Sequence, residues 1–330
     1  MSYEPPFKVT ARIINLISDI SASLERYRIH LEKSGSIRLR KINRMKTIHG
    51  SLAIEGNSLS EEQVTDLIDG KPVIAPVKEV QEVRNAIKAY EQFMNFEPYS
   101  CKSLLKAHSI MALGLVDNPG HFRKGGVCVA GKEGIAHIAP PADRVPFFLD
   151  DLFEWLKTAE DHILIKSCVF HYEFEFIHPF EDGNGRMGRF WQSRILAEWN
   201  EAFAQLPIEN MIWEHQSEYY RAIQDSTENN DSGIFIEFML SVILESLKKH
   251  IKNDNANNSV NNNVNNNVKL TKNQRKIIET IRQNPFVTQE ELSRIVDITI
   301  ANINLNMKKL QQNGIIKRTG ADKNGKWVIV

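Results

Sequence analysis

The stretch HPFEDGNGRMGR, residues 178–189, places one histidine, two acidic residues, three glycines and two arginines within twelve positions. Its glycines follow the spacing G-x-G-x-x-G, which also marks the phosphate-binding turn of dinucleotide-binding domains. Such a turn needs a buried strand directly before it and a helix directly after it. The stretch therefore presents a choice between holding a dinucleotide and carrying out chemistry on a phosphate.

The residues before this stretch, FHYEFEF at 170–176, allow either a strand or a helix. Four aromatic residues alternate with polar ones as in a half-buried strand, but Phe170, Phe174 and Ile177 also share one face of a helix. The segments up to about residue 249 are mostly helical in period, and parallel strand–helix–strand units do not recur in them. A dinucleotide turn also gives the histidine, the aspartate and the arginines no role, so we disfavour it.

The glycines and arginines suit the binding of a phosphate. Residues 183–185 can turn successive backbone N–H groups toward an anion, and a helix that begins at Arg186 adds the positive partial charge of its N-terminus. Arg186 and Arg189 are three residues apart, so they share one helix face and can bind one polyphosphate together. The sequence has no G-x-x-x-x-G-K-[ST] motif, so transfer of a γ-phosphoryl group on a P-loop is not indicated.

The histidine and the aspartate supply the rest of the chemistry. A histidine such as His178 titrates near neutrality and can accept a proton from an incoming hydroxyl. Asp182 offers an oxygen ligand for Mg²⁺ that is held jointly with phosphates. A base, a metal ligand, an anion-binding turn and two cations are the groups that transfer of a nucleotidyl group to a hydroxyl requires.

The whole string resembles the signature of the Fic family, H-P-F-x-[D/E]-G-N-G-R-x-x-R, at every position that the signature specifies. The resemblance extends over roughly residues 50–245. It implies a mainly α fold in which FHYEFEFI is helical and a Fic-type helical core carries a β-hairpin flap. It also implies transfer of AMP from ATP to a Ser, Thr or Tyr hydroxyl of a protein, with release of pyrophosphate.

The resemblance further implies a role for each matching position. His178 would be the general base, and Asp182 would hold Mg²⁺. A tyrosine near the adenine is also implied, for which Tyr219 and Tyr220 are both candidates, as are Asn229 and Asn230 for an asparagine. The residues that would bind ATP, with Glu55 included because it competes for the same space, are Glu55, Gly183, Asn184, Gly185, Arg186, Met187, Gly188, Arg189, Tyr219 and Tyr220.

Two short β-prone runs flank Gly131-Lys132-Glu133-Gly134, which predicts a hairpin. By resemblance this hairpin, residues 127–137, is the flap on which an extended segment of the protein substrate docks by β-augmentation.

A second string, SLAIEGN at 51–57, fits the family's inhibitory pattern [S/T]-x-x-x-E-[G/N] through Ser51, Glu55 and Gly56. It lies upstream of the active site, as in the subclass whose inhibitory helix is N-terminal. By resemblance, Glu55 would pair with Arg189 in the space of the ATP γ-phosphate. A carboxylate there neutralises the cation and repels an incoming phosphate, so we expect the resting enzyme to be self-inhibited.

Composition divides the chain further. Residues 252–270 form an asparagine tract with little apolar material to bury, which we interpret as a disordered linker. From Lys269 to Val330 the chain carries twelve Lys or Arg and five Asp or Glu, a net charge of +7, so the rest of the neutral chain carries −7. We predict four parts: an N-terminal helical region with the inhibitory motif at 1–100, the Fic core at 101–250, the linker at 251–269 and a winged helix-turn-helix at 270–330.

The last part shows three helical segments and two apolar strands. Asn284-Pro285 ends the first helix, Thr288 with Glu291 predicts a capping box for the second, and Thr299 can cap the third. Asn313-Gly314 is expected to stop the third helix, and the turn-rich TGADKNG at 319–325 to join the strands.

Its charge suggests DNA as a partner, with the helix over 299–312 as the recognition element. Asparagines can read adenine edges and lysines can meet phosphates; here they are Asn302, Asn304, Asn306, Lys308 and Lys309. Winged helices also dock proteins or form dimers, so a protein partner or a homodimer stays an open alternative.

Other sequence features favour a cytoplasmic protein. No run of about 18 uncharged apolar residues is present, so we expect no membrane span, and MSYEPPFKVTARI at the N-terminus lacks the apolar core of a secretory signal. Cys101, Cys128 and Cys168 lack C-x-x-C spacing, which argues against a disulfide framework or a zinc site.

Three alternative functions stay open. The same site could remove AMP from a modified protein, or it could use another nucleotide donor, because an anion-binding turn reads phosphates rather than the base. The chain could also be a DNA-binding regulator whose Fic core only senses nucleotide. The intact His178 disfavours this last alternative, since sensing needs no general base.

Overall fold

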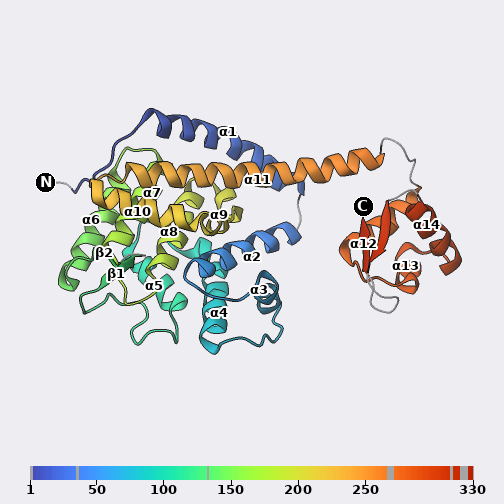
Figure 1. Cartoon of the computed structure of the whole chain (residues 1–330), viewed down its shortest axis with the longest axis horizontal. Helices are drawn as coiled ribbons and strands as arrows, with labels where there is room; N and C mark the ends of the chain where they lie inside the picture. The colour runs from blue at the N-terminus through green and yellow to red at the C-terminus, as the bar shows by residue number, and fades with distance from the viewer. Residues whose placement is uncertain are drawn as a thin grey trace. The chain divides into compact units, whose positions relative to one another are not determined.

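The structure is a computed structural model that describes residues 3–34, 37–131, 134–265, 271–312, 315–319 and 326–329. The chain divides into two compact units, Met1–Ile251 and Lys252–Val330 (Figure 1). The mainly helical fold confirms the predicted fold class. The helices that begin in the first unit are α1 Ala11–Ser34, α2 Ile37–Ile54, α3 Glu61–Ile68, α4 Val77–Glu91, α5 Cys101–Met111, α6 Val145–Thr158, α7 Ile163–Ile177, α8 Asn184–Trp199, α9 Ile208–Glu214, α10 Gln216–Asn229 and α11 Gly233–Asn265, with short 3₁₀ helices at Phe93–Asn95, Ala142–Arg144 and Glu201–Gln205.

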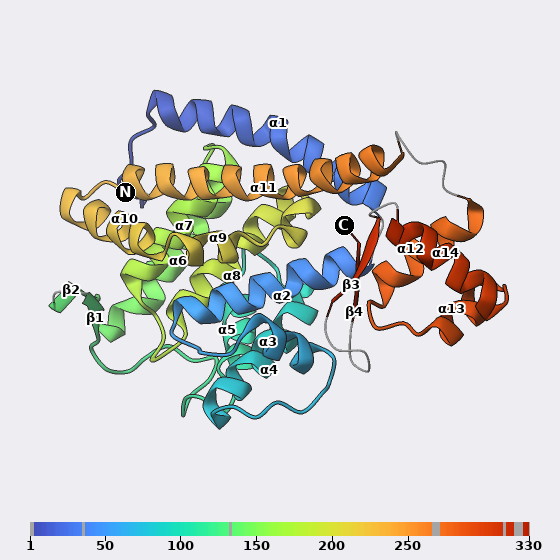
Figure 2. The same cartoon turned by 45° about the vertical axis from the view of Figure 1, so that its right-hand side comes forward.

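Helices α7 and α8 form the centre of the first unit. Most side chains of both are buried, including Phe170, Phe174, Phe190 and Trp191. A helix that is buried on most sides must be surrounded by other elements, and in both views the other helices of the unit enclose this pair (Figures 1 and 2). FHYEFEFI is therefore helical, and the strand-like alternation of its aromatic residues reflects burial on every face.

The flap is present as an antiparallel hairpin of β1 Cys128–Gly131 and β2 Gly134–Ile138, at the edge of the first unit (Figure 2). Its strands pair from Cys128↔Ile138 to Gly131↔Gly134, with a register shift between Val129 and Ala130. The expected turn residues Lys132 and Glu133 lie outside the described residues.

Two boundaries differ from the sequence expectation. Helix α8 begins at Asn184 rather than at Arg186, because Gly183 supplies a left-handed N-cap with φ 87°. Helix α11 continues to Asn265, so residues 252–265 of the expected disordered linker are helical. A helix already nucleated on a buried apolar segment, 235–247, gains one hydrogen bond for each residue added, which extends it into residues of poor helix propensity.

The second unit is a winged helix of α12 Lys272–Gln283, α13 Gln289–Val296 and α14 Ile300–Gln312, with a two-stranded sheet of β3 Ile316–Thr319 and β4 Lys326–Ile329. It has its own core, in which all three helices and both strands take part. The capping box of Thr288 with Glu291 is confirmed, and Thr299 Oγ1 accepts from the Asn302 N–H at 3.3 Å. The predicted stop at Asn313-Gly314 and the turn at 320–325 lie outside the described residues.

Two further expectations concern sequence features of the whole chain. Among the helices that the structure describes, none combines the length and apolar character needed to cross a bilayer. Cys101 and Cys168 are free thiols, and the Cys128 side chain lies outside the described ones.

Candidate active site

The motif loop begins with a strained residue. His178 ends α7 in the left-handed region, with φ 49° and ψ 61°, and its N–H donates to the Phe174 carbonyl at 2.9 Å. A residue with a Cβ pays roughly 1–2 kcal/mol for this conformation. Such strain persists only where the surrounding structure holds it, and it is typical of functional sites. The residue expected to be the base is therefore placed by its backbone at the end of a rigid, buried helix.

Asn184 closes the loop. Its amide accepts from the Phe180 N–H at 2.9 Å and donates to the Phe180 carbonyl at 2.9 Å. The side chain of Asn184 thus shapes the motif, while the first turn of α8 leaves backbone N–H groups that have no partner within the helix. What residues 183–185 offer to an anion is consequently their main-chain N–H groups, because the Asn184 side chain is bonded within the loop.

His108, on α5, supports the same loop, and sequence reasoning missed it. Its ring stacks on Phe180 with centroids 3.6 Å apart and planes 2° apart. The Gly120 N–H donates to Nδ1 at 2.9 Å, so the proton is on Nε2, which donates to the Asp182 carbonyl at 3.1 Å. Burial lowers the pKa of His108 to about 4, which keeps this tautomer neutral.

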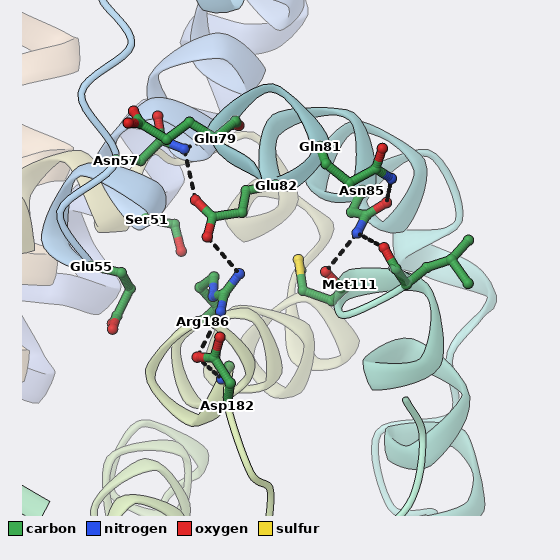
Figure 3. Close-up of polar contacts among 12 residues, drawn as sticks. Ser51, Glu55, Asn57, Glu79, Gln81, Glu82, Asn85, Met111, Asp182 and Arg186 are labelled. Carbon is green, nitrogen blue, oxygen red and sulfur yellow. Dashed lines mark hydrogen bonds and ion pairs between the residues drawn. The ribbon is translucent and has the colours of Figure 1, made fainter. Parts of the chain in front are cut away.

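Asp182 and Arg186 form one charged cluster with Glu82 of α4. Arg186 Nη2 donates to Asp182 Oδ1 at 2.9 Å, and Arg186 Nη1 lies 3.8 Å from Glu82 Oε1 (Figure 3). Glu82 Oε2 in turn accepts from Nδ2 of Asn57, the last residue of the string SLAIEGN, at 2.8 Å. Burial raises the pKa of Asp182, but the charge and hydrogen bond of Arg186 and the Gly183 N–H outweigh it, so the net shift is downward. Asp182 is therefore a carboxylate.

The residues present fit Mg²⁺ held largely by a substrate. The described residues contain no cluster of three acidic, histidine or cysteine side chains that could hold a metal ion by themselves. Mg²⁺ commonly takes one or two carboxylates and completes its shell with water and substrate phosphates. Asp182 can supply that carboxylate.

Arg189 is paired as expected with the inhibitory string. Its side chain is 1% exposed; Nη2 donates to Glu55 Oε1 at 2.7 Å and to the Ser51 carbonyl at 2.9 Å, and Nε donates to Ser51 Oγ at 3.4 Å. Burial lowers the pKa of Arg189, but the facing Glu55 carboxylate and other acidic groups more than reverse this, so the guanidinium stays charged.

The motif glycines make room for two carboxyl groups. A Cβ placed on Gly185 would lie 2.2 Å from Glu55 Oε1, and one placed on Gly188 would lie 2.6 Å from Glu175 Oε1. Both distances are far inside van der Waals contact, so neither position accepts a side chain without a shift. The G-x-x-G spacing thus accommodates an acidic side chain from the residue after α2 and one from α7. A dinucleotide turn needs a strand before its glycines, and a helix stands there instead.

Glu175 is a second residue that the sequence analysis missed. Burial raises its pKa to about 8, against the opposing effect of Arg189, so the carboxyl is mostly protonated at neutral pH. Next to it, burial lowers the pKa of His171 to about 3; this ring meets Gln192 Oε1 at 2.7 Å and the Tyr219 hydroxyl at 3.1 Å.

The two tyrosine candidates have different surroundings. Tyr219 is 1% exposed, and its hydroxyl is used by His171. Tyr220 is 41% exposed, and its hydroxyl donates to the Ile54 carbonyl at 3.3 Å, beside Glu55. Of the two side chains, only that of Tyr220 is exposed enough to contact a ligand.

The surroundings of three other candidate residues also differ from one another. Met187 is fully buried in the hydrophobic core, because its position on α8 points away from the face shared by Arg186 and Arg189. Asn229 is exposed and bonds the Asp225 carbonyl within its own helix, and Asn230 ends α10 in a left-handed conformation. The Met187 side chain therefore packs in the core, and a role for this residue in binding ATP stays a prediction about its backbone.

Buried donors in the site point to an anionic ligand. Arg186 Nε and Arg189 Nη1 are buried, and neither has a hydrogen-bond partner in the described part of the chain. Leaving a buried donor unsatisfied costs roughly 1–3 kcal/mol. Two such donors near the start of α8, with the Asp182 carboxylate bonded to Arg186, fit an anion such as a phosphate.

Comparison with known proteins agrees with this class of site. The family model "Fic/DOC family" matches residues 98–196, and a model for winged helix-turn-helix DNA-binding domains matches residues 270–317. The crystal structure of a Fic family protein from Desulfovibrio desulfuricans G20 is similar over 99% of this chain and 98% of its own, with 36% sequence identity and a TM-score of 0.77. The chain therefore belongs to the Fic family.

Curated relatives are named as enzymes. The protein adenylyltransferase Fic of Culex quinquefasciatus is 27% identical over 225 residues, which are 64% of this chain and 42% of the relative. A probable protein adenylyltransferase of Aquifex aeolicus is 31% identical over 111 residues, which are 33% of this chain and 32% of the relative. The chain spans less than half the length of these relatives.

Proposed function

We propose that this chain is a protein adenylyltransferase: it transfers AMP from ATP to a hydroxyl of a protein and releases pyrophosphate. The observation that carries the proposal is the pair of almost fully buried guanidinium groups, Arg186 and Arg189, in the first two turns of α8, with Asp182 bonded to Arg186 and His178 at the start of the same motif. The names of the curated relatives support the same activity.

The arrangement assigns a task to each group. His178 accepts the proton of the target hydroxyl while that oxygen attacks the α-phosphorus of ATP, and the bond from this phosphorus to the pyrophosphate oxygen breaks. Arg186, Arg189 and the backbone N–H groups at the start of α8 bind the charge that collects on the leaving pyrophosphate. Asp182 would hold Mg²⁺, which neutralises phosphate charge when it is bound.

The proposal includes restraint by Glu55. Its contact with Arg189 at 2.7 Å occupies one of the two cations, and its carboxylate lies over Gly185, where the first turn of α8 offers its N–H groups. A nucleotide whose terminal phosphates need this space must displace the carboxylate or pay for like-charge repulsion. Ser51, in the last turn of α2, and Glu55, directly after the helix, both accept hydrogen bonds from Arg189.

Contacts with α9 and α10 hold the end of α2 where Glu55 meets Arg189. The Ile54 carbonyl accepts from Gln216 Nε2 at 2.8 Å and from the Tyr220 hydroxyl at 3.3 Å. Gly50 lies so close to α9 that an added Cβ would be 2.6 Å from the Asn210 backbone. The carboxylate is therefore placed by contacts on both sides of it.

The test compares ATP labelled on its α- or γ-phosphate, with Mg²⁺, in the native chain, Glu55→Gly and His178→Ala. Protein-bound label from the α-position alone, strongest in Glu55→Gly and absent from His178→Ala, is the expected result. Incorporation of label only from another nucleotide would show that the donor is not ATP. If a premodified chain loses its label and no variant incorporates any, the activity is removal of AMP rather than its transfer.

We also propose that the second unit binds DNA. Helix α14 exposes Asn302, Asn304, Lys308 and Lys309, and the match to DNA-binding winged helices covers this helix. Each lysine that meets a phosphate contributes about one to the slope of log affinity against log salt. Replacing Lys308 and Lys309 together by Ala should therefore lower that slope by about two in a fluorescence-anisotropy titration with duplex DNA. Self-association without DNA binding would instead favour the dimer alternative.

A further inference from the structure

One buried arginine outside the motif, Arg123, joins the motif loop to the flap. Its side chain is 3% exposed. It makes four hydrogen bonds, all to main-chain carbonyls: Nε to His178 at 2.7 Å, Nη1 to Gly125 at 2.8 Å, and Nη2 to Pro140 at 2.5 Å and to Ile177 at 3.3 Å. Its own N–H adds a fifth bond, to the Pro179 carbonyl at 2.9 Å.

The acceptors belong to two structures. Three are consecutive carbonyls, residues 177–179, at the point where α7 ends and the motif begins. The other two, Gly125 and Pro140, lie on either side of the hairpin, at its entry and its exit, where Ala139 N–H also donates to the Val127 carbonyl at 3.2 Å. A single planar group thus fixes both legs of the flap to the backbone of His178.

A guanidinium is suited to this position and an ammonium is not. It offers five N–H donors in a rigid plane, whereas a lysine offers three donors at one point. Its charge also meets the carbonyl end of α7, where the helix dipole is negative. Burial lowers the pKa of Arg123, which reflects the cost of removing this cation from water. Within the described residues its hydrogen-bond acceptors are carbonyl oxygens and not carboxylates.

The left-handed backbone of His178 explains what the bonds accomplish. That conformation is unfavourable by itself, and the Arg123 bonds to the carbonyls of residues 177 and 178 hold it from one side. The same guanidinium sets the position of the flap relative to that backbone. A displacement of one end is therefore transmitted to the other.

We propose that Arg123 is a positioning residue that aligns the flap with His178, so that a substrate segment docked on the flap presents its hydroxyl to the imidazole. This inference rests on the proposed AMP transfer. It places a determinant of catalysis in the segment between α5 and the flap, 55 residues before the base.

The kinetic test uses the full chain carrying Glu55→Gly, with Arg123→Lys or Arg123→Met added, and measures AMP transfer and ATP affinity. A misplacement of about 1 Å can cost on the order of 10²-fold in rate, so we expect kcat to fall at least tenfold while the Kd for ATP changes less than twofold. Arg144→Lys is the matched control, because Arg144 is exposed and follows the flap. Unchanged kcat in both Arg123 variants, or an equal loss of ATP affinity, would overturn the proposal.

A second measurement does not depend on activity. In hydrogen–deuterium exchange, Arg123→Lys should exchange faster than the native chain in residues 127–139 and 178–184, while α9 to α11 keep their protection. If Glu55→Gly transfers no AMP but this exchange pattern appears, the proposed function fails, while the link that Arg123 makes between the flap and the motif loop is supported. Native exchange rates in both segments would show that Arg123 does not link them.

Discussion

Replacing Gly50 by Ala should activate the enzyme by displacing α2. The new Cβ would lie 2.6 Å from both Cα and N of Asn210 and 2.8 Å from the Glu209 carbonyl carbon. All three are backbone atoms, so α2 and α9 must separate by about 0.8 Å to reach 3.4 Å, the near limit of ordinary contact. The displaced segment ends in Glu55, little more than one helical turn further on.

The size of the effect follows from the contact that is lost. Glu55 and Arg189 meet at 2.7 Å, and a charge-assisted hydrogen bond of this kind is worth about 1.5–3 kcal/mol. Losing half to all of it removes about 1–3 kcal/mol of restraint, which corresponds to roughly 5- to 10²-fold faster AMP transfer at low ATP. Overpacking costs about 1–3 kcal/mol of stability, partly offset by the better helix propensity of Ala.

The assay is the initial rate of α-label incorporation at low ATP, with Tm measured on the same samples. Ile20→Val serves as the control, because it removes one buried methylene group from α1, outside α2 and α9, at a cost of about 0.5–1.5 kcal/mol. A lower Tm with no gain in rate for Gly50→Ala, as for the control, would show that the position of α2 does not determine the restraint.

Three more outcomes are expected. Gln216→Ala removes one hydrogen bond to the Ile54 carbonyl, worth about 1 kcal/mol, so label incorporation should rise about fivefold; a decrease would instead tie Gln216 to substrate binding. Because burial raises the pKa of Glu175 from its ordinary 4.5 to about 8 in the folded chain, the native chain should lose stability relative to Glu175→Gln as pH rises from about 4.5 to 8; parallel Tm–pH curves would contradict this. His108→Phe keeps a stacked ring but loses two hydrogen bonds, so kcat and Tm should both fall, and retention of both would make the bonds dispensable.

Sequence reasoning located the motif because its residues are contiguous. The histidine, the aspartate and both arginines of residues 178–189 fall within twelve positions, and one short string also contains Glu55, whose contact with Arg189 the structure shows. Helix α7 was ambiguous for a physical reason: a helix buried on all sides has no polar face, so its composition carries no helical period.

The supporting residues could not be found in the same way. Arg123 and His108 act on main-chain carbonyls of residues far away in the sequence, and such contacts leave no spacing pattern. Glu82 and Glu175 look like ordinary helix acids until the fold places them beside Arg186 and Gly188. The extension of α11 over residues 252–265 was missed because composition describes a segment alone and not the helix that precedes it.

The most direct test of the account is the intact mass of the protein after incubation with ATP and Mg²⁺, measured for Glu55→Gly and for Glu55→Gly combined with His178→Ala. The account predicts a species heavier by one AMP in the single variant and none in the double variant. Equal masses before and after incubation of Glu55→Gly, with and without added candidate target proteins that also gain no mass, would contradict self-restrained AMP transfer at this site.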